Sequence, residues 1–167
     1  MRIYLIGFMG CGKSTLAREL ASQLGLSFID MDKFIEERYL KAIPQLFAED
    51  GEPVFRLKER NCLQEIAGFQ DVVVATGGGL PCFFENMKLM RETGISVFLD
   101  VDCRELFRRL RKSAQKRPLL ENKTDEQLLA YIEQTMILRR PFYEQAAYIV
   151  SGNAIGVSDI IQKSGIS

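Results

Sequence analysis

The chain has 167 residues, of which 47% are hydrophobic and 26% are charged, a composition typical of one soluble globular domain. Its 22 basic and 22 acidic residues cancel to a formal net charge of zero, which argues against nucleic acid or an anionic membrane as a partner. Histidine is absent, so imidazole catalysis is excluded and the commonest metal ligand is missing. Any chemistry must use carboxylates, lysine, arginine, hydroxyls or backbone groups.

The four cysteines are scattered and form no CxxC pair, which favours free thiols in a cytoplasmic protein. No apolar run approaches the roughly 18 residues of a membrane span. The apolar residues 3–9 fit a buried strand better than a signal peptide. Zero net charge and the lack of a heptad seam lead us to expect a monomer.

Five short apolar runs predict strands at residues 3–6, 27–29, 72–75, 95–99 and 147–150. Nearly every residue in these runs is apolar, which is typical of strands covered on both faces. Helical patterns separate the runs; the first has leucines four residues apart and ends at Gly25. This alternation predicts a single α/β domain over residues 1–167, with a parallel sheet and helices on both faces.

The first predicted strand leads into the sequence GFMGCGKST at residues 7–15, which fits G-x-x-x-x-G-K-[ST] and opens a helix. This context is the one that a phosphate-binding P-loop requires. We expect Lys13 to bridge the β- and γ-phosphates of a nucleotide and the Ser14 hydroxyl to ligate Mg²⁺. The expected nucleotide-binding residues are Gly10, Cys11, Gly12, Lys13, Ser14 and Thr15, with Cys11 contributing no side-chain chemistry.

Two acids, Asp30 and Asp32, follow the second predicted strand. In an extended segment, residues two apart face the same way, and open α/β sheets bind ligands at the carboxyl ends of their strands. We therefore interpret Asp30 as part of the Mg²⁺ shell and Asp32 as the group that orients an acceptor hydroxyl and accepts its proton. The alternative is that one or both acids cap the next helix.

More than forty residues separate the second and third strands, and Pro44 and Pro53 are each placed to start a helix there. Arg56 and Glu59 lie one helical turn apart, which by itself indicates a surface pair worth about 0.2–0.5 kcal/mol. Three glycines, residues 77–79, follow the third strand. They would let backbone N–H groups approach a small ligand, although a flexible turn explains them as well.

Residues 104–117 after the fourth strand carry seven basic side chains against one acid, Glu105. A solvated helix face explains most of them, and an anionic ligand would relieve their repulsion. Residues 122–125 spell the N-K-x-D of switch GTPases, but no buried strand precedes them, and Thr124 with Gln127 predicts a helix capping box instead. Arg139, which precedes the fifth strand, has the planar fork that suits a carboxylate.

Taken together in this order and spacing, these motifs resemble those of the shikimate kinases over nearly the whole chain. The shared motifs are the P-loop, D-x-D at 30–32, G-E-x-x-F-R at 51–56, the triple glycine at 77–79, R-P-L-L at 117–120 and R-x-P-x-Y at 139–143. The resemblance implies a nucleoside-monophosphate-kinase-like fold, a five-stranded parallel sheet in the order 2-3-1-4-5. It also implies an acceptor-binding segment at about 31–60 and a lid at about 112–124.

The same resemblance implies a function: phosphorylation of the 3-hydroxyl of shikimate, with ATP as cosubstrate and Mg²⁺, in aromatic amino acid biosynthesis. It implies that shikimate is bound by Asp32, Arg56, Gly78, Gly79 and Arg139, with both arginines on its carboxylate. Arg117 would reach the phosphates from the lid and act with Lys13 and Asp32 in catalysis. Phe55, Glu59 and Pro118 would support the wall of the site.

The sequence departs from the family pattern upstream of Arg117. The family often has an arginine that stacks on adenine seven residues before it, but Leu110 stands there, and Arg109 or Arg111 could take its place. Two alternatives to a shikimate kinase are a kinase for a nucleoside monophosphate or a sugar acid such as gluconate, and an ATP-binding regulatory module without catalysis. The paired arginines favour a carboxylated acceptor, and Asp32 favours an enzyme.

Overall fold

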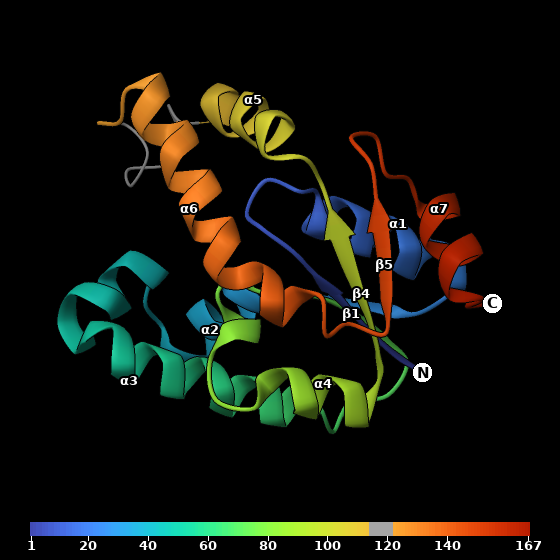
Figure 1. The fold of residues 1–167 in the computed structure, drawn as a ribbon. Helices are drawn as coiled ribbons and strands as arrows, with labels where there is room; N and C mark the ends of the chain where they lie inside the picture. Colours follow the sequence, from blue (N-terminus) through green and yellow to red (C-terminus); the bar gives the residue numbers. More distant parts are fainter. Residues whose placement is uncertain (114–121) are drawn as a thin grey trace.

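The protein is described by a computed structural model that covers residues 1–113 and 122–167. At its centre is one parallel sheet of five strands in the order β2-β3-β1-β4-β5 (Figure 1). The strands are β1 (Arg2–Ile6), β2 (Ser27–Asp30), β3 (Val72–Ala75), β4 (Ile95–Asp100) and β5 (Tyr148–Ser151). The expected strand order is confirmed, and each strand begins and ends within one residue of its predicted position.

The central strands are buried because helices cover both faces of the sheet. In β1, Ile3 pairs with Val73 of β3 on one side and with Ile95 of β4 on the other, and every residue of β3 is buried. This two-sided burial explains why the strand sequences are apolar throughout rather than alternating.

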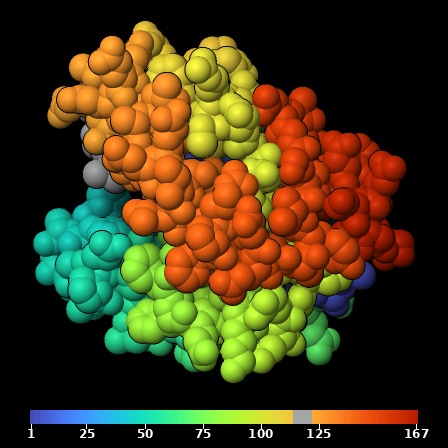
Figure 2. All heavy atoms as spheres, in the orientation of Figure 1, coloured from blue at the N-terminus to red at the C-terminus, as the bar shows by residue number. Residues whose placement is uncertain are grey.

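The helices divide between the two faces of the sheet (Figure 1). They are α1 (Lys13–Leu24), α2 (Met31–Tyr39), α3 (Ile43–Ile66), α4 (Asn86–Thr93), α5 (Cys103–Ser113), α6 (Asp125–Tyr143) and α7 (Val157–Ser164), with a short 3₁₀ helix, η1 (Leu80–Cys82). Helices α1 and α7 pack against each other on one face, while α3, α4 and α6 lie on the other. In the space-filling view, α6 lies across the molecule between α5 and the α3–α4 region (Figure 2).

The helix ends follow the predicted signals. Gly25 ends α1 in the left-handed conformation at φ 67°, which glycine adopts without steric cost. Thr124 begins α6 with the expected capping box: the Gln127 backbone N–H donates to the Thr124 hydroxyl, and the Thr124 N–H donates to the Gln127 side chain. These residues therefore start a helix, which supports setting the GTPase motif aside.

The long segment between β2 and β3 contains α2 and the bent helix α3. Pro44 lies in the first turn of α3, and Gly51 interrupts the helix with φ 76° and ψ 168° before Pro53 begins its second half. Both prolines thus lie at helix starts, as predicted. The bend matters for the site, because the second half of α3 carries Arg56 and Glu59 toward the sheet.

None of the helices in the described parts of the chain is long and apolar enough to cross a membrane.

Candidate active site

The P-loop connects the end of β1 to the start of α1. Gly10 and Gly12 have positive φ angles of 81° and 98°, and Gly12 is the N-cap of α1 without any side-chain hydrogen bond to the helix. The backbone N–H groups at the start of α1 are therefore left for a ligand rather than for a capping side chain. Together with the positive end of the helix dipole, they form an anion-binding site.

A cavity of about 270 Å³ lies over this loop, at the carboxyl ends of the central strands. Beyond the loop glycines, its walls include Lys13, Ser14, Asp30, Asp32, Thr76 and Gly78. The cavity thus joins the predicted phosphate site to the predicted acceptor site. Met9 also lines the cavity, and neither it nor Thr76 was predicted from the sequence to have a role.

Lys13 lies within the P-loop itself. Its Nζ donates hydrogen bonds to the carbonyl oxygens of Gly7 at 2.7 Å and Phe8 at 2.9 Å, and it lies 3.8 Å from the sulfur of Cys11. The ammonium group is therefore held at the mouth of the loop, beside the cavity. Cys11 is buried and free, so only its backbone can face a nucleotide.

Asp30 caps α2 and also contacts the P-loop. Its Oδ1 accepts hydrogen bonds from the backbone N–H groups of Asp32 at 3.1 Å and Lys33 at 3.4 Å, which caps α2. Its Oδ2 accepts the Ser14 hydroxyl at 2.7 Å. The capping role and the contact with the P-loop use different oxygens of one carboxylate, so one does not exclude the other.

The expectation that Asp30 and Asp32 lie on one extended segment is wrong. The strand β2 ends at Asp30, and α2 begins at Met31, so Asp32 lies in the first turn of the helix. Both acids nevertheless line the cavity. Asp30 caps α2, so the helix begins at Met31. The first turn of this helix then brings Asp32 to the cavity.

Gly77 lies between two carboxylates from different helices. A Cβ atom at this position would be 3.0 Å from Oε1 of Glu59 and 3.2 Å from Oδ1 of Asp32. A side chain on residue 77 would therefore press on both carboxylates. Glu59 and Asp32, which the sequence separates by 27 residues, are therefore neighbours, and Asp32 lines the cavity.

The next two glycines each lie against one of the predicted carboxylate-binding arginines. A Cβ atom on Gly78 would be 3.2 Å from Nη1 of Arg139, and one on Gly79 would be 2.6 Å from Nη2 of Arg56. Because these glycines are consecutive, the two guanidinium groups approach adjacent residues of one loop, and Gly78 of this loop lines the cavity. We call Gly77–Gly79 with Arg56, Glu59 and Arg139 the acceptor wall, after the predicted role of its arginines. A side chain on Gly79 would have to displace Arg56. The triple glycine thus reflects close packing as well as freedom of the backbone.

Arg56 and Glu59 form a buried pair, which corrects the expectation of a surface pair. Only 9% of Arg56 and 1% of Glu59 is exposed. Nη1 of Arg56 donates to Oε2 of Glu59 at 3.0 Å, while Nε and Nη2 donate to Oε1 of Glu52 at 3.3 Å. The guanidinium also lies 4.2 Å from the ring centroid of Phe83. Aromatic rings and two acids therefore hold the arginine in one orientation.

Burial raises the pKa of Glu59 to about 7, against the opposing effect of the Arg56 charge and hydrogen bond. A carboxyl group with this pKa changes its ionisation near neutral pH. The neighbouring Asp32 raises it further, while Arg139 lowers it, so the group responds to all three predicted shikimate ligands around it.

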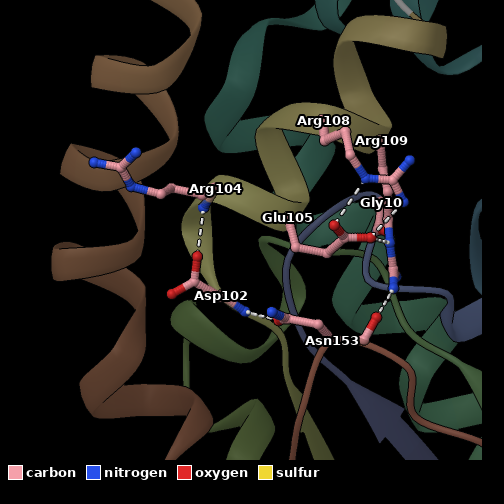
Figure 3. Close-up of polar contacts among 7 residues, drawn as sticks. All are labelled: Gly10, Asp102, Arg104, Glu105, Arg108, Arg109 and Asn153. Carbon is pink, nitrogen blue, oxygen red and sulfur yellow. Dashed lines mark hydrogen bonds and ion pairs between the residues drawn. The ribbon is translucent and has the colours of Figure 1, made fainter.

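Arg109 reaches the P-loop from α5 (Figure 3). Its Nη1 donates to the carbonyl of Gly10 at 3.3 Å, and its Nη2 donates to the carbonyl of Asn153 at 2.7 Å. Its Nε donates to Oε1 of Glu105 at 2.9 Å. The hydrogen bonds from Arg108 and Arg109 lower the pKa of Glu105 to about 2. Asn153 lies within residues 151–154, where the family resemblance implies an adenine loop that is too short here to align residue by residue.

The next two residues of α5, Leu110 and Arg111, make other contacts. Leu110 is buried, and a Cβ atom on Gly10 would lie 3.0 Å from its Cδ2, so it packs beneath the P-loop. Arg111 forms an ion pair with Asp125 of α6. Of the two arginines that the sequence left open, only Arg109 contacts the P-loop and the loop after β5. Arg117 and Pro118 lie outside the described residues.

A P-loop at the end of a central strand, with Asp32 facing the same cavity, defines a phosphoryl-transferring enzyme of the P-loop kinase class. The family model described as shikimate kinase matches residues 9–164. The chain belongs to the shikimate kinase family.

Similar proteins cover nearly the whole chain. The chain is 51% identical to a shikimate kinase of Phocaeicola vulgatus over 163 residues, which is 98% of this chain and 93% of that protein. A crystal structure of shikimate kinase from Bacteroides thetaiotaomicron has a TM-score of 0.92 at 46% identity, covering 97% of this chain and 94% of that chain. A shikimate kinase from Acinetobacter baumannii in complex with shikimate has a TM-score of 0.83 at 35% identity, covering 96% of this chain and 88% of that chain.

Proposed function

We propose that the protein transfers the γ-phosphoryl group of ATP to the 3-hydroxyl of shikimate. The observation that carries this proposal is the wall formed by Gly78 and Gly79, where Arg139 and Arg56 approach consecutive residues beside the P-loop cavity. Two guanidinium groups on one wall suit the single carboxylate of a small acceptor. In a nucleoside monophosphate the anionic phosphate is itself the phosphoryl acceptor, and the base at the other end offers no carboxylate to this pair.

On the nucleotide side, backbone N–H groups from Gly10 to Thr15 bind the phosphates, and Lys13 neutralises charge between the β- and γ-phosphates. Lys13 already lies at the loop mouth, with its ammonium on two backbone carbonyls. Arg109 packs on the adenine, because it joins the P-loop to the loop at Asn153. This assignment selects Arg109 over Arg111.

The Ser14 hydroxyl and the Asp30 carboxylate are the candidate Mg²⁺ ligands. They lie 2.7 Å apart in the cavity, and both offer the oxygen donors that Mg²⁺ prefers. Proteins commonly hold Mg²⁺ with one or two such groups together with the phosphates of the substrate. Bound there, Mg²⁺ neutralises charge on the phosphate oxygens.

Asp32 holds the acceptor hydroxyl in line with the transferred group. The transition state of phosphoryl transfer is loose, so positioning contributes more than strong base catalysis, and proton removal comes late. Asp32 suits this role because it lines the cavity together with the P-loop residues and lies beside Gly77, the first residue of the triple glycine. Arg56 and Arg139 then fix the other end of the acceptor through its carboxylate.

The acceptor-binding segment and the lid rest on the sequence resemblance. Residues 31–60 are the acceptor-binding segment, and residues 112–124 are the lid from which Arg117 stabilises the transferred phosphoryl group. Most of that lid lies outside the described residues. A monomer is expected, which light scattering would check, and the expected location is the cytoplasm.

A coupled ADP-release assay separates this proposal from its alternatives. The purified protein is given ATP and Mg²⁺ with shikimate, gluconate, AMP or no acceptor, and the phosphorylated product is identified by mass spectrometry. The proposal expects rapid ADP release with shikimate alone. Release with AMP or gluconate would indicate a different kinase, and ATP binding without turnover on any acceptor would indicate a regulatory module.

A further inference from the structure

Tyr143, the last residue of α6, has a hydroxyl group that the proposed reaction does not use. The residue is 0% exposed, and its ring packs on Phe98 with the centroids 5.1 Å apart. Its hydroxyl donates a hydrogen bond to the carbonyl oxygen of Gly78 at 2.6 Å. A buried tyrosine hydroxyl needs a partner, and here that partner is the backbone of the acceptor wall.

The Gly78 carbonyl and the Gly79 N–H belong to the same planar peptide, where they point in opposite directions. A hydrogen bond that fixes the carbonyl therefore fixes the direction of the N–H. The loop is tied down on either side, because Leu80 N–H donates to Gly77 and Cys82 N–H donates to Gly79. Within residues 1–113 and 122–167, no acceptor takes the Gly79 N–H itself, so this donor remains for a ligand.

Such an anchor has a physical purpose at this position. Consecutive glycines allow their shared peptide to rotate more freely than any other pair of residues does. Without a fixed carbonyl, the Gly79 N–H would lose its direction toward a ligand. The Tyr143 ring cannot follow such a rotation, because it is buried against Phe98 in the core.

The same hydroxyl lies next to Arg139, one helical turn earlier in α6. The Arg139 charge and hydrogen bond lower the pKa of Tyr143, although burial has the larger effect and raises it. Nη1 of Arg139 would be 3.2 Å from a Cβ atom on Gly78, so the guanidinium, the hydroxyl and the Gly78 peptide meet at one place. Tyr143 is therefore linked to two predicted ligands of the acceptor, one on a loop and one on a helix.

From this geometry we infer that Tyr143 is a positioning residue for the carboxylated acceptor. Its hydroxyl fixes the Gly78–Gly79 peptide relative to Arg139, so that the Gly79 N–H and the Arg139 guanidinium can bind the same ligand. The inference rests on the proposed function, because it takes shikimate as the acceptor. It assigns no contact between Tyr143 and the substrate, so the residue is not catalytic.

The test compares Tyr143→Phe with Tyr4→Phe. Tyr4 is also fully buried, but its hydroxyl bonds to Thr93 just before β4, at the amino ends of the strands and away from the cavity at their carboxyl ends. We expect Tyr143→Phe to weaken shikimate binding about tenfold by calorimetry, the effect of one lost hydrogen bond to a positioned group. The KM for ATP should stay within about twofold, and Tyr4→Phe should leave both values unchanged.

An independent readout follows the Gly79 amide by NMR. We expect shikimate to shift this resonance in the wild-type protein, and Tyr143→Phe to shift it without any ligand, whereas Tyr4→Phe does not. Three results would each overturn the inference. They are unchanged shikimate affinity in a folded Tyr143→Phe protein, a rise in the KM for ATP equal to that for shikimate, and a Gly79 resonance that does not shift when shikimate is added to the wild-type protein. A wild-type protein that does not bind shikimate at all would instead overturn the proposed function first, and the inference with it.

Discussion

Glu59 offers the sharpest quantitative test of the buried acceptor wall. The perturbation is Glu59→Gln, which keeps the shape of the side chain and removes its ionisation. In the folded protein, burial raises the pKa of this carboxyl to about 7, from an ordinary value of 4.5. The folded state therefore keeps a proton that the unfolded state releases between these two pH values.

The sign of the effect follows from that difference. Where the folded state binds more protons than the unfolded state, stability falls as the pH rises. The contribution of Glu59 is fully present below pH 4.5 and is lost as the pH rises through 7. Between pH 5 and pH 7.5, these two pKa values correspond to a loss of about 2 kcal/mol in the free energy of unfolding.

Urea denaturation at pH 5 and pH 7.5 measures this loss. The wild-type protein should lose more stability between the two values than Glu59→Gln, by about 2 kcal/mol. Because the substitution also removes a partner of Arg56, the comparison uses the change with pH and not the absolute stability. Glu49→Gln is the control, since Lys41 and Gln45 lower the pKa of this exposed acid and it is mostly ionised in both states above pH 5.

Equal pH dependence in the wild-type and Glu59→Gln proteins would refute the reasoning. It would mean that Glu59 ionises as readily in the folded protein as in the unfolded chain. The Arg56 pair would then behave as a solvated surface pair, as the spacing of the two residues alone suggests.

The remaining predictions concern catalysis and binding. Asp32→Asn should lower kcat at least about 100-fold with little change in ATP affinity, and near-normal turnover would refute its role. Arg56→Ala should raise the shikimate KM about 100-fold in steady-state kinetics, and an unchanged KM would count against the carboxylate contact. Arg109→Ala should raise the KM for ATP about tenfold while Arg111→Ala leaves it within twofold; equal effects would contradict the choice of Arg109.

Much of the fold could be predicted from the sequence because its signals are local. The strands are short apolar runs, so their positions follow from composition alone. Gly25 ends α1, and Thr124 with Gln127 begins α6, because each signal acts within one helical turn. The P-loop is equally local: its glycines and Lys13 occupy one turn between a strand and a helix. The strand order, by contrast, came from the family resemblance.

The acceptor wall could not be predicted because it depends on contacts between distant segments. The spacing of Arg56 and Glu59 fits a surface pair, and only packing against rings such as Phe83 buries it. The position of Asp32 depends on where β2 stops, which the capping of α2 by Asp30 decides. The choice between neighbouring arginines on α5 depends on which side of the helix faces the P-loop.

A crystal structure of the protein with ADP, Mg²⁺ and shikimate tests the central claim most directly. The account predicts that the shikimate carboxylate lies between the guanidinium groups of Arg56 and Arg139, with its 3-hydroxyl against Asp32 and directed at the nucleotide. A shikimate molecule bound with its carboxylate away from both arginines, or with a different hydroxyl at Asp32, would contradict it.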